Sequence, residues 1–271
     1  MYKPELLSYS LGAHVCAFST MRGGGYSSGA YATFNANAYC GDDERHVALN
    51  RALLCDELGL SADRLIIPHQ VHGDRVLRID DRFFADDEAA RGAALEGADA
   101  VMTDLPHVCV SVSTADCIPV LVYDSRHHAV AAVHAGWRGT MLRIVETTLG
   151  AMHEAYGTEP SDVQAVIGPG ISLDAFEVGD EVYEAFARAG FPMDRIARRF
   201  PVRSASGPVV PEKWHIDLWA ANRLSLERAG VCAGSIRLSG ICTYTHYDRF
   251  FSARRLGIRS GRILNGIFLI E

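Results

Sequence analysis

The chain has 271 residues, of which 48% are hydrophobic and 22% are charged, so it is long and apolar enough to bury a substantial core. Its formal net charge is −7 and its 26 lysines and arginines are scattered, which sets nucleic acid aside as the main partner. No apolar run has the roughly 18 residues that span a bilayer, nor the length of a signal-peptide core, so we expect a cytoplasmic protein without a membrane partner.

The N-terminal part predicts a glycine-rich loop, a helix and a strand followed by a loop. Residues 22–35 contain three adjacent glycines, which indicate either a plain tight turn or a backbone nest for an anion. A helix should begin near Asp42, because acidic residues open it, apolar residues recur at helical spacing, and Gly59 can end it. Residues 66–76 then predict a short strand entering a loop, and the polar residues 80–98 predict a surface excursion.

The central part predicts three neighbouring strands and a long helix. Residues 107–134 contain three short apolar runs, HVCVSV, IPVLVY and AVAAVH, separated by TADC and DSRHH. An amphipathic helix should run from Gly139 to about Gly157, because apolar residues recur at spacings of four, four and three.

The C-terminal part continues the alternation of helices and strands. The expected elements are a strand VQAVIG, a helix EVYEAFARAG, a less regular stretch over 191–214, a helix DLWAANRLSLERAG capped by Asp217, a strand SIRLSG and a closing strand ILNGIFLI. The whole pattern predicts a single α/β domain over residues 1–271 with a mixed, multi-strand sheet.

Three short motifs contain residues that bind metal in other proteins: PHQVHG at 68–73, TADC at 114–117 and VHAGWRG at 133–139. Imidazole and thiolate suit zinc, and a catalytic zinc site uses three protein ligands with an open fourth position, which one histidine of the first motif, Cys117 and His134 would provide. Alone, each motif has a structural interpretation, and for the histidines it is the commoner one: hydrogen-bonded loop histidines, a buried thiol and a core histidine. The seven cysteines are irregularly spaced, so we interpret them as reduced thiols.

In this order, PHQVHG, TADCIPVLVYD and AAVHAGWRGT resemble the signature blocks of the YfiH-like family. The resemblance extends over nearly the whole chain through RGGGYSSGAYATFN, GDDERHVALNR, DLWAANRLSLERAGV and CTYTHYDRFFSARR. It implies a layered, CNF-like α/β fold and a zinc-dependent purine nucleoside phosphorylase. The implied substrates are phosphate and adenosine, inosine or methylthioadenosine, with adenosine deamination as a side activity.

The resemblance also implies roles for particular residues. The metal ligands fall on His72, Cys117 and His134, which are therefore the catalytic candidates as well. Arg51 falls on the family's basic residue in the substrate site, where a planar guanidinium suits phosphate. Tyr39 departs from the pattern, because many members have histidine there, so the substrate pocket is expected to differ.

Other residues leave two interpretations open. Arg22 and Arg138 suit a phosphate contact as well as a surface salt bridge. Cys242 and His246 suit either the surroundings of the metal or ordinary structure. No general acid or base is identified, because Asp116 adjoins a proposed ligand on an extended segment, where neighbouring side chains point to opposite sides.

Four other functions compete with the phosphorylase. A copper polyphenol oxidase, with copper as the cofactor, needs paired histidine arrays, and the 11 histidines form no H-x-H pair. A cysteine hydrolase would use Cys117 as nucleophile and His134 as base. A non-catalytic zinc protein and a hydrolase that edits a cell-wall precursor also fit the motifs. We expect a monomer or a weak homo-oligomer.

Overall fold

In the computed structural model, which describes residues 2–202 and 210–271, the strands form three sheets. The five-stranded sheet has the order β1 (Leu6–Tyr9), β2 (Val15–Thr20), β14 (Ile263–Leu269), β6 (Cys109–Thr114) and β3 (Leu65–Ile66). The six-stranded sheet has the order β13 (Ile236–Leu238), β9 (Val163–Ile167), β7 (Ile118–Asp124), β8 (Ala129–Ala135), β5 (Ala100–Thr103) and β4 (Val76–Arg78). The three-stranded sheet has the order β10 (Glu177–Val178), β12 (Val210–Ile216) and β11 (Ala197–Val202).

Both larger sheets combine parallel and antiparallel neighbours: β3 runs parallel to β6, and β13 parallel to β9, whereas β7 and β8 are antiparallel. The expected mixed α/β class is therefore confirmed. The expectation of one sheet is wrong, because the strands of the N- and C-terminal segments form a second large sheet with β6.

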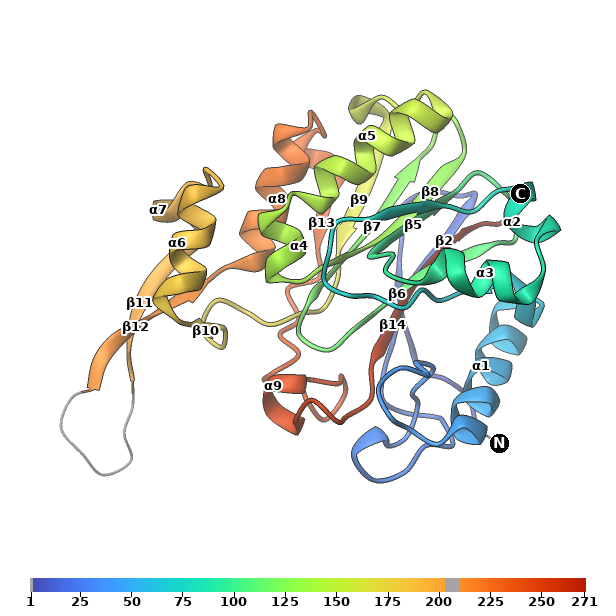
Figure 1. Cartoon of the computed structure of the whole chain (residues 1–271), viewed down its shortest axis with the longest axis horizontal. Helices are drawn as coiled ribbons and strands as arrows, with labels where there is room; N and C mark the ends of the chain where they lie inside the picture. The colour runs from blue at the N-terminus through green and yellow to red at the C-terminus, as the bar shows by residue number, and fades with distance from the viewer. Residues whose placement is uncertain (1, 203–209) are drawn as a thin grey trace.

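Helices cover the outer faces of these sheets. The α-helices are α1 (Glu44–Leu58), α2 (Asp81–Ala85), α3 (Glu88–Leu95), α4 (Trp137–Met141), α5 (Ile144–Tyr156), α6 (Asp180–Arg188), α7 (Met193–Ile196), α8 (Leu218–Arg228) and α9 (Ala253–Leu256). Short 3-10 helices lie at Gly29–Tyr31, Ala62–Arg64, Pro160–Asp162 and Ala233–Ser235. Helices α4, α5 and α8 pack on the six-stranded sheet, and α1 packs on the five-stranded one (Figure 1). Within the described ranges, no helix combines the length and apolarity that crossing a membrane requires.

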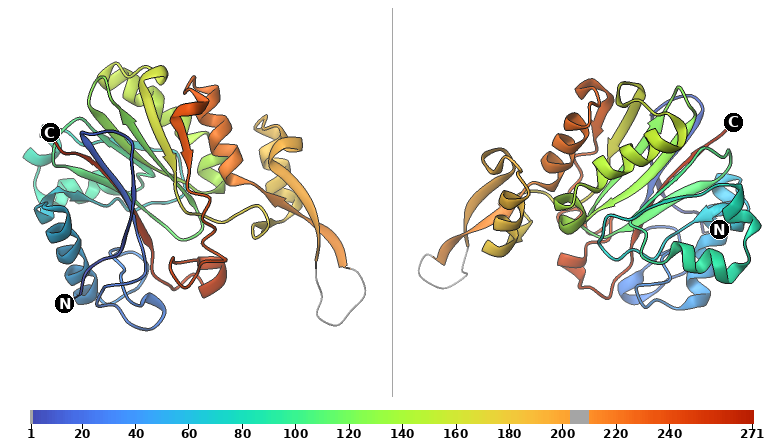
Figure 2. Two further views of the ribbon diagram at one scale, coloured as in Figure 1. Left: turned by 180° about the vertical axis from the view of Figure 1, so that it is seen from behind. Right: turned by 45° about the horizontal axis from the view of Figure 1, so that its top comes forward.

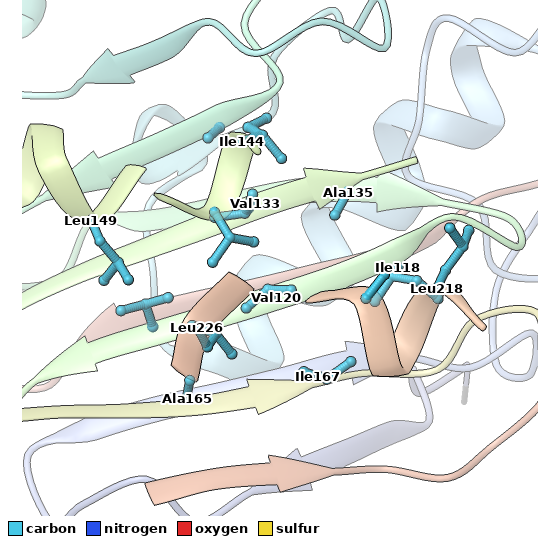
Figure 3. Packing of buried hydrophobic residues seen from close by; sticks show 14 of the residues in the cluster. Ile118, Val120, Val133, Ala135, Ile144, Leu149, Ala165, Ile167, Leu218 and Leu226 are labelled. Atoms are coloured by element: carbon cyan, nitrogen blue, oxygen red, sulfur yellow. The ribbon is translucent and has the colours of Figure 1, made fainter. Parts of the chain in front are cut away.

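The two larger sheets pack face to face and share one buried cluster, to which β6 contributes Val110 and Val112, and β7 and β8 contribute Leu121 and Val130. The opposite face of β7 and β8 meets the helices, so both strands are buried along their whole length. Figure 3 shows this second face, where Leu149 of α5 and Leu226 of α8 lie against the sheet. Burial on both faces explains the nearly continuous apolar runs in their sequences.

The termini of α1 agree with the expectation from the sequence. The Asp43 side chain accepts hydrogen bonds from the amides of Arg45 and His46, and Gly59 adopts the left-handed conformation (φ 67°) at the other end. Asp217 caps α8 in the same way, accepting from the Ala220 amide.

The long helix expected from Gly139 is divided into α4 and α5. Arg143 lies between them with φ 63°, which ends one helix and starts the next. Its guanidinium donates to Glu146 and to the Ala189 carbonyl, and these bonds help to offset the strained backbone. The end expected near Gly157 is confirmed.

The stretch 191–214 is more regular than expected, because it contains α7, β11 and most of β12. These elements and α6 form an arm that projects from the two packed sheets (Figures 1 and 2). Charged residues such as Arg199 and Lys213 interrupt the apolar alternation of its strands, which obscured them in the sequence. The middle of this stretch, residues 203–209, lies outside the described residues.

Candidate metal centre and its cavity

The structure brings together three side chains that are far apart in the sequence. The donor atoms of His72, Cys117 and His134 all lie within 4.8 Å of one another. In the part of the chain that is described, no other group of three or more histidine, cysteine or acidic side chains has this spacing. The expected convergence is thus observed, while the role of the three as metal ligands stays a prediction.

Adjacent strands and one loop bring these residues together. Cys117 directly precedes β7, and His134 lies opposite Pro119 in the pairing of β7 with β8, so both occupy the same end of neighbouring strands. His72 lies on the loop between β3 and β4 in a left-handed conformation with φ 64°. A non-glycine residue rarely adopts this conformation unless other contacts hold it.

Asp99 provides those contacts. Its buried carboxylate accepts hydrogen bonds from the backbone amides of Val71, His72 and Gly73 at 2.7–3.1 Å. It also lies 2.7 Å from Nδ1 of His134, so Nε2 is the nitrogen left for a metal. One carboxylate therefore positions two of the three donor residues. Sequence reasoning missed Asp99, because nothing in the segment EGADA distinguishes it from other acidic residues.

The electrostatics favour a thiolate at this site. Burial raises the pKa of the Cys117 thiol, but the adjacent His134 and His72 outweigh burial and lower it to about 6. Burial lowers the pKa of His134, but Cys117 and Asp99 raise it to about 9. The pair is therefore a thiolate and an imidazolium at neutral pH, and a bound metal would displace the imidazolium proton.

The donor set fits a borderline-soft metal such as zinc. Gly136 approaches the donors so closely that an added Cβ would lie 3.0 Å from the Cys117 sulfur and 3.1 Å from Cδ2 of His72. The glycine therefore keeps the space beside the donors free. Two imidazoles and one thiolate leave one tetrahedral position for water or substrate.

The three donors line a cavity of about 710 Å³. Its wall also includes Asn37, Tyr39, His69, Trp137, Arg254 and Arg262. This volume lies within the range of ordinary small-molecule sites, and the wall combines aromatic rings with polar and cationic groups.

The arginine expected to hold phosphate lies beside this cavity rather than in its wall. Arg51 is half-buried on α1, where its Nε donates to the Ala36 carbonyl at 2.8 Å. Burial lowers the pKa of its guanidinium and the nearby Tyr39 raises it. Arg254 and Arg262 line the cavity instead. Arg254 lies in the resemblance block CTYTHYDRFFSARR, which is the one sequence signal that pointed to either residue.

The two further arginines also lie outside the cavity wall. Arg22 stacks on Phe251 with 4.9 Å from its guanidinium carbon to the ring centroid, and Arg138 stacks on Trp137 at 4.4 Å. The glycine loop beside Arg22 is packed against its neighbours, because a side chain at Gly24, where φ is 83°, would collide with the Lys3 carbonyl. These contacts support the structural interpretation of the loop as a tight turn.

The remaining candidates serve structural contacts. Both carboxylate oxygens of Asp116 accept hydrogen bonds at 2.7 Å, one from the Thr243 hydroxyl and one from the Arg254 amide. Cys242 accepts from the amide and hydroxyl of Ser172, and neither Cys242 nor His246 lines the cavity. Asp116 is thus engaged through both oxygens, and Cys242 and His246 lie away from the cavity wall.

Comparisons with known proteins agree with the fold. A family model described as multi-copper polyphenol oxidoreductase laccase matches residues 16–270. The chain is 49% identical over 265 residues to a purine nucleoside phosphorylase of Bacteroides thetaiotaomicron, covering 98% of this chain and 94% of that protein. It is 46% identical over 252 residues to the adenosine deaminase RL5 of an unknown prokaryotic organism, covering 93% of each. The crystal structure of the Bacillus licheniformis protein YfiH superimposes with a TM-score of 0.84 at 29% identity, over 94% of this chain and 92% of that one.

Proposed function

The chain belongs to the YfiH-like family, whose model is described as multi-copper polyphenol oxidoreductase laccase, and on this premise we propose that it is a zinc-dependent purine nucleoside phosphorylase. Its proposed substrates are phosphate and adenosine, inosine or methylthioadenosine, and its products are the free base and the ribose 1-phosphate. Adenosine deamination is the proposed side activity. The observation that carries the proposal is the group formed by His72, Cys117 and His134 in the wall of a nucleoside-sized cavity.

The donor set supports zinc over copper. Multicopper chemistry needs several metal sites, whereas residues 2–202 and 210–271 contain one group with metal-site spacing. When bound, zinc would polarise a substrate oxygen or lower the pKa of a bound water to about 7, as deamination requires. His72, Cys117 and His134 would hold it, and Asp99 would keep two of them in place.

The cationic side chains around the cavity are suited to binding phosphate. Phosphorolysis brings phosphate against the anomeric carbon while negative charge develops on the departing base, so preorganised positive groups stabilise the transition state. We assign a phosphate contact to Arg51, since only its Nε is hydrogen-bonded among the described contacts and both terminal nitrogens remain available.

The decisive experiment supplies nucleosides to purified protein of known metal content, with and without phosphate. We expect about one zinc and little copper per chain. Free base should form from inosine or adenosine only when phosphate is present, and inosine should form from adenosine more slowly. If fully zinc-loaded protein leaves every purine nucleoside unchanged, the cell-wall editing or scaffold function takes precedence.

The phosphate contact has a separate test. Arg51→Ala should reduce phosphorolysis about tenfold or more while changing deamination little, because only phosphorolysis uses phosphate. Arg45→Ala, an exposed position on the same helix, is the matched control. An equal loss of both reactions in Arg51→Ala, with zinc content and folding intact, would remove the assignment.

A cysteine hydrolase is the second candidate, because the thiolate and imidazolium pair of Cys117 and His134 resembles an activated nucleophile and its base. Metal dependence separates the two functions, since a hydrolase of this type works with a free thiolate. Activity that survives complete removal of zinc would favour the hydrolase.

We also infer that residues 1–271 form one domain, since the two larger sheets share one buried cluster. A single cooperative unfolding transition, monitored by two spectroscopic probes, is expected.

A further inference from the structure

A carboxylate and an imidazole form a pair at the rim of the cavity, next to the metal-binding residues. Nδ1 of His69 lies 2.8 Å from both carboxylate oxygens of Glu96, and His69 lines the same cavity as Cys117 and His134. We propose that His69, oriented by Glu96, is the residue that transfers the proton to the departing purine. This inference rests on the proposed phosphorylase function and names the acid and base that it needs.

The position of His69 is fixed by its backbone. Its amide donates to the Leu95 carbonyl at 3.1 Å, and its carbonyl accepts from the Gly97 amide at 2.8 Å, which forms a bridge to the segment that carries Glu96. Arg75 donates to the Glu96 carbonyl at 2.7 Å and secures that segment. The pair is therefore built on two connected backbone segments, unlike an ion pair between two flexible side chains.

Gln70, which follows His69, and the ring of Tyr39 restrain the position of His69 further. Gln70 both donates to the Ser113 carbonyl and accepts from the Ser113 amide, which attaches the loop to β6. The ring of Tyr39 stacks on the imidazole of His69, with 4.3 Å between centroids and 22° between planes. The imidazole is thus restrained in plane and direction, as a proton-transfer group should be.

The chemistry leaves one nitrogen of His69 for the substrate. Glu96 occupies Nδ1, and within the described residues Nε2 has no protein partner, so Nε2 is the atom available to a ligand. The carboxylate fixes the tautomer and the orientation of the ring, as in other catalytic pairs of this kind. Asp116, a carboxylate in the cavity wall, is already engaged through both oxygens.

The proposed step conserves protons and electrons. An oxygen of hydrogenphosphate forms a bond to C1′ of the nucleoside as the bond from C1′ to N9 breaks, and the electron pair of that bond leaves with the purine. The His69 imidazolium donates its Nε2 proton to N7 of the purine. The proton of the phosphate then returns to Nε2, so the products are the neutral base and ribose 1-phosphate, and His69 is regenerated.

The test compares two substrates in the zinc-loaded, full-length protein. Inosine needs a proton on its leaving base, whereas 7-methylinosine already carries a positive charge on its purine and needs none. His69→Asn should reduce inosine phosphorolysis by about 100-fold. Turnover of 7-methylinosine should fall by less than about threefold, and zinc content should be unchanged. Glu96→Gln should show the same selectivity with a smaller loss.

His153→Asn is the matched control, because His153 forms an exposed pair with Glu159 at 3.6 Å away from the cavity. An equal loss on both substrates, or a loss of zinc in His69→Asn, would overturn the proposal. If the wild type does not accept 7-methylinosine, rescue of His69→Gly by added imidazole decides: rescue supports proton transfer, and its absence overturns it. A wild-type protein inactive on every purine nucleoside refutes the proposed function itself, which the variants do not test.

Discussion

The cavity holds its histidines in two ways, in the metal-binding group His72, Cys117 and His134, called the inner wall, and at His69 with Glu96, called the rim. His69 and the exposed His72 come from the same motif, PHQVHG, but a buried carboxylate positions His72 and an exposed carboxylate positions His69. On the inner wall, Asp99 is fully buried and positions His72 through backbone amides and His134 through its imidazole. On the rim, the Glu96 side chain is 61% exposed and holds His69 by hydrogen bonds to Nδ1. A buried charge that loses its partners costs far more than an exposed one. Changes to the wall should therefore abolish zinc binding, whereas changes to the rim should leave the zinc bound.

Removal of a donor from the inner wall should have the largest effect. Cys117→Ser and His134→Ala each take a ligand from the proposed zinc site, so both phosphorolysis and deamination should fall at least about 1,000-fold. Zinc content, measured by elemental analysis, should fall with them. Cys232→Ser, at an exposed cysteine, is the control that should keep metal and activity. Full activity in a zinc-depleted Cys117→Ser protein would contradict the metal site.

Loss of the Asp99 carboxylate, which positions His72 and His134, should have the second-largest effect. Asp99→Asn retains the side-chain size but removes the charge that holds His134 and three amides, so zinc affinity should fall about 10- to 100-fold. Competition with a chromogenic chelator measures this affinity directly. Asp104→Asn, at a carboxylate 3.7 Å from Arg78, provides the control. Unchanged affinity in Asp99→Asn would show that strand pairing alone positions the donors.

The three donor residues were predictable from the sequence, whereas the role of Asp99 was not. The three donors were predictable because their motifs combine chemistry with a resemblance, and the elements that carry Cys117 and His134 were predictable from continuous apolar runs. Asp99 acts through hydrogen bonds to residues 26 to 28 positions before it and 35 positions after it. The pairing of β5 with β8 brings Asp99 to His134, and the bridge between His69 and Glu96 brings it to the loop of His72; no local pattern specifies either contact.

The elements of the fold were likewise predictable where nearby residues specify them and not where distant contacts do. Helix α1 was predictable because Asp43 and Gly59 are local signals at its ends. The break at Arg143 was not, since a distant carbonyl at Ala189 stabilises it. The second large sheet depends on contacts between the two ends of the chain, which local periodicity does not report.

The reactivity of the Cys117 thiol should depend on pH, because its pKa is lowered. Because the pKa of Cys117 is lowered from 9.0 to about 6, its thiolate should be nearly fully formed at pH 7 and should be lost only as the pH falls through 6. In metal-free protein, iodoacetamide should label Cys117 roughly tenfold faster at pH 7 than an ordinary thiol. Peptide mass spectrometry between pH 5 and 9 gives the profile, and zinc should suppress the labelling. An inflection near pH 9 would contradict the thiolate.

The smallest effect is expected at Tyr39, on the rim of the cavity. Tyr39 is 51% exposed and contributes a ring stacked on His69, and such aromatic contacts contribute about 0.5–1.5 kcal/mol. Tyr39→Ala should therefore reduce kcat/KM for inosine about two- to tenfold without changing zinc content, because the hydrogen bonds with Glu96 still hold the imidazole. Tyr39→His keeps an aromatic ring and should lose less than about twofold. Tyr2→Ala, which removes a comparable ring stacked on Tyr26 with 4.5 Å between centroids, should leave kcat/KM unchanged. A loss of 100-fold or more in Tyr39→Ala, or any loss of zinc, would mean that rim and wall act as one unit.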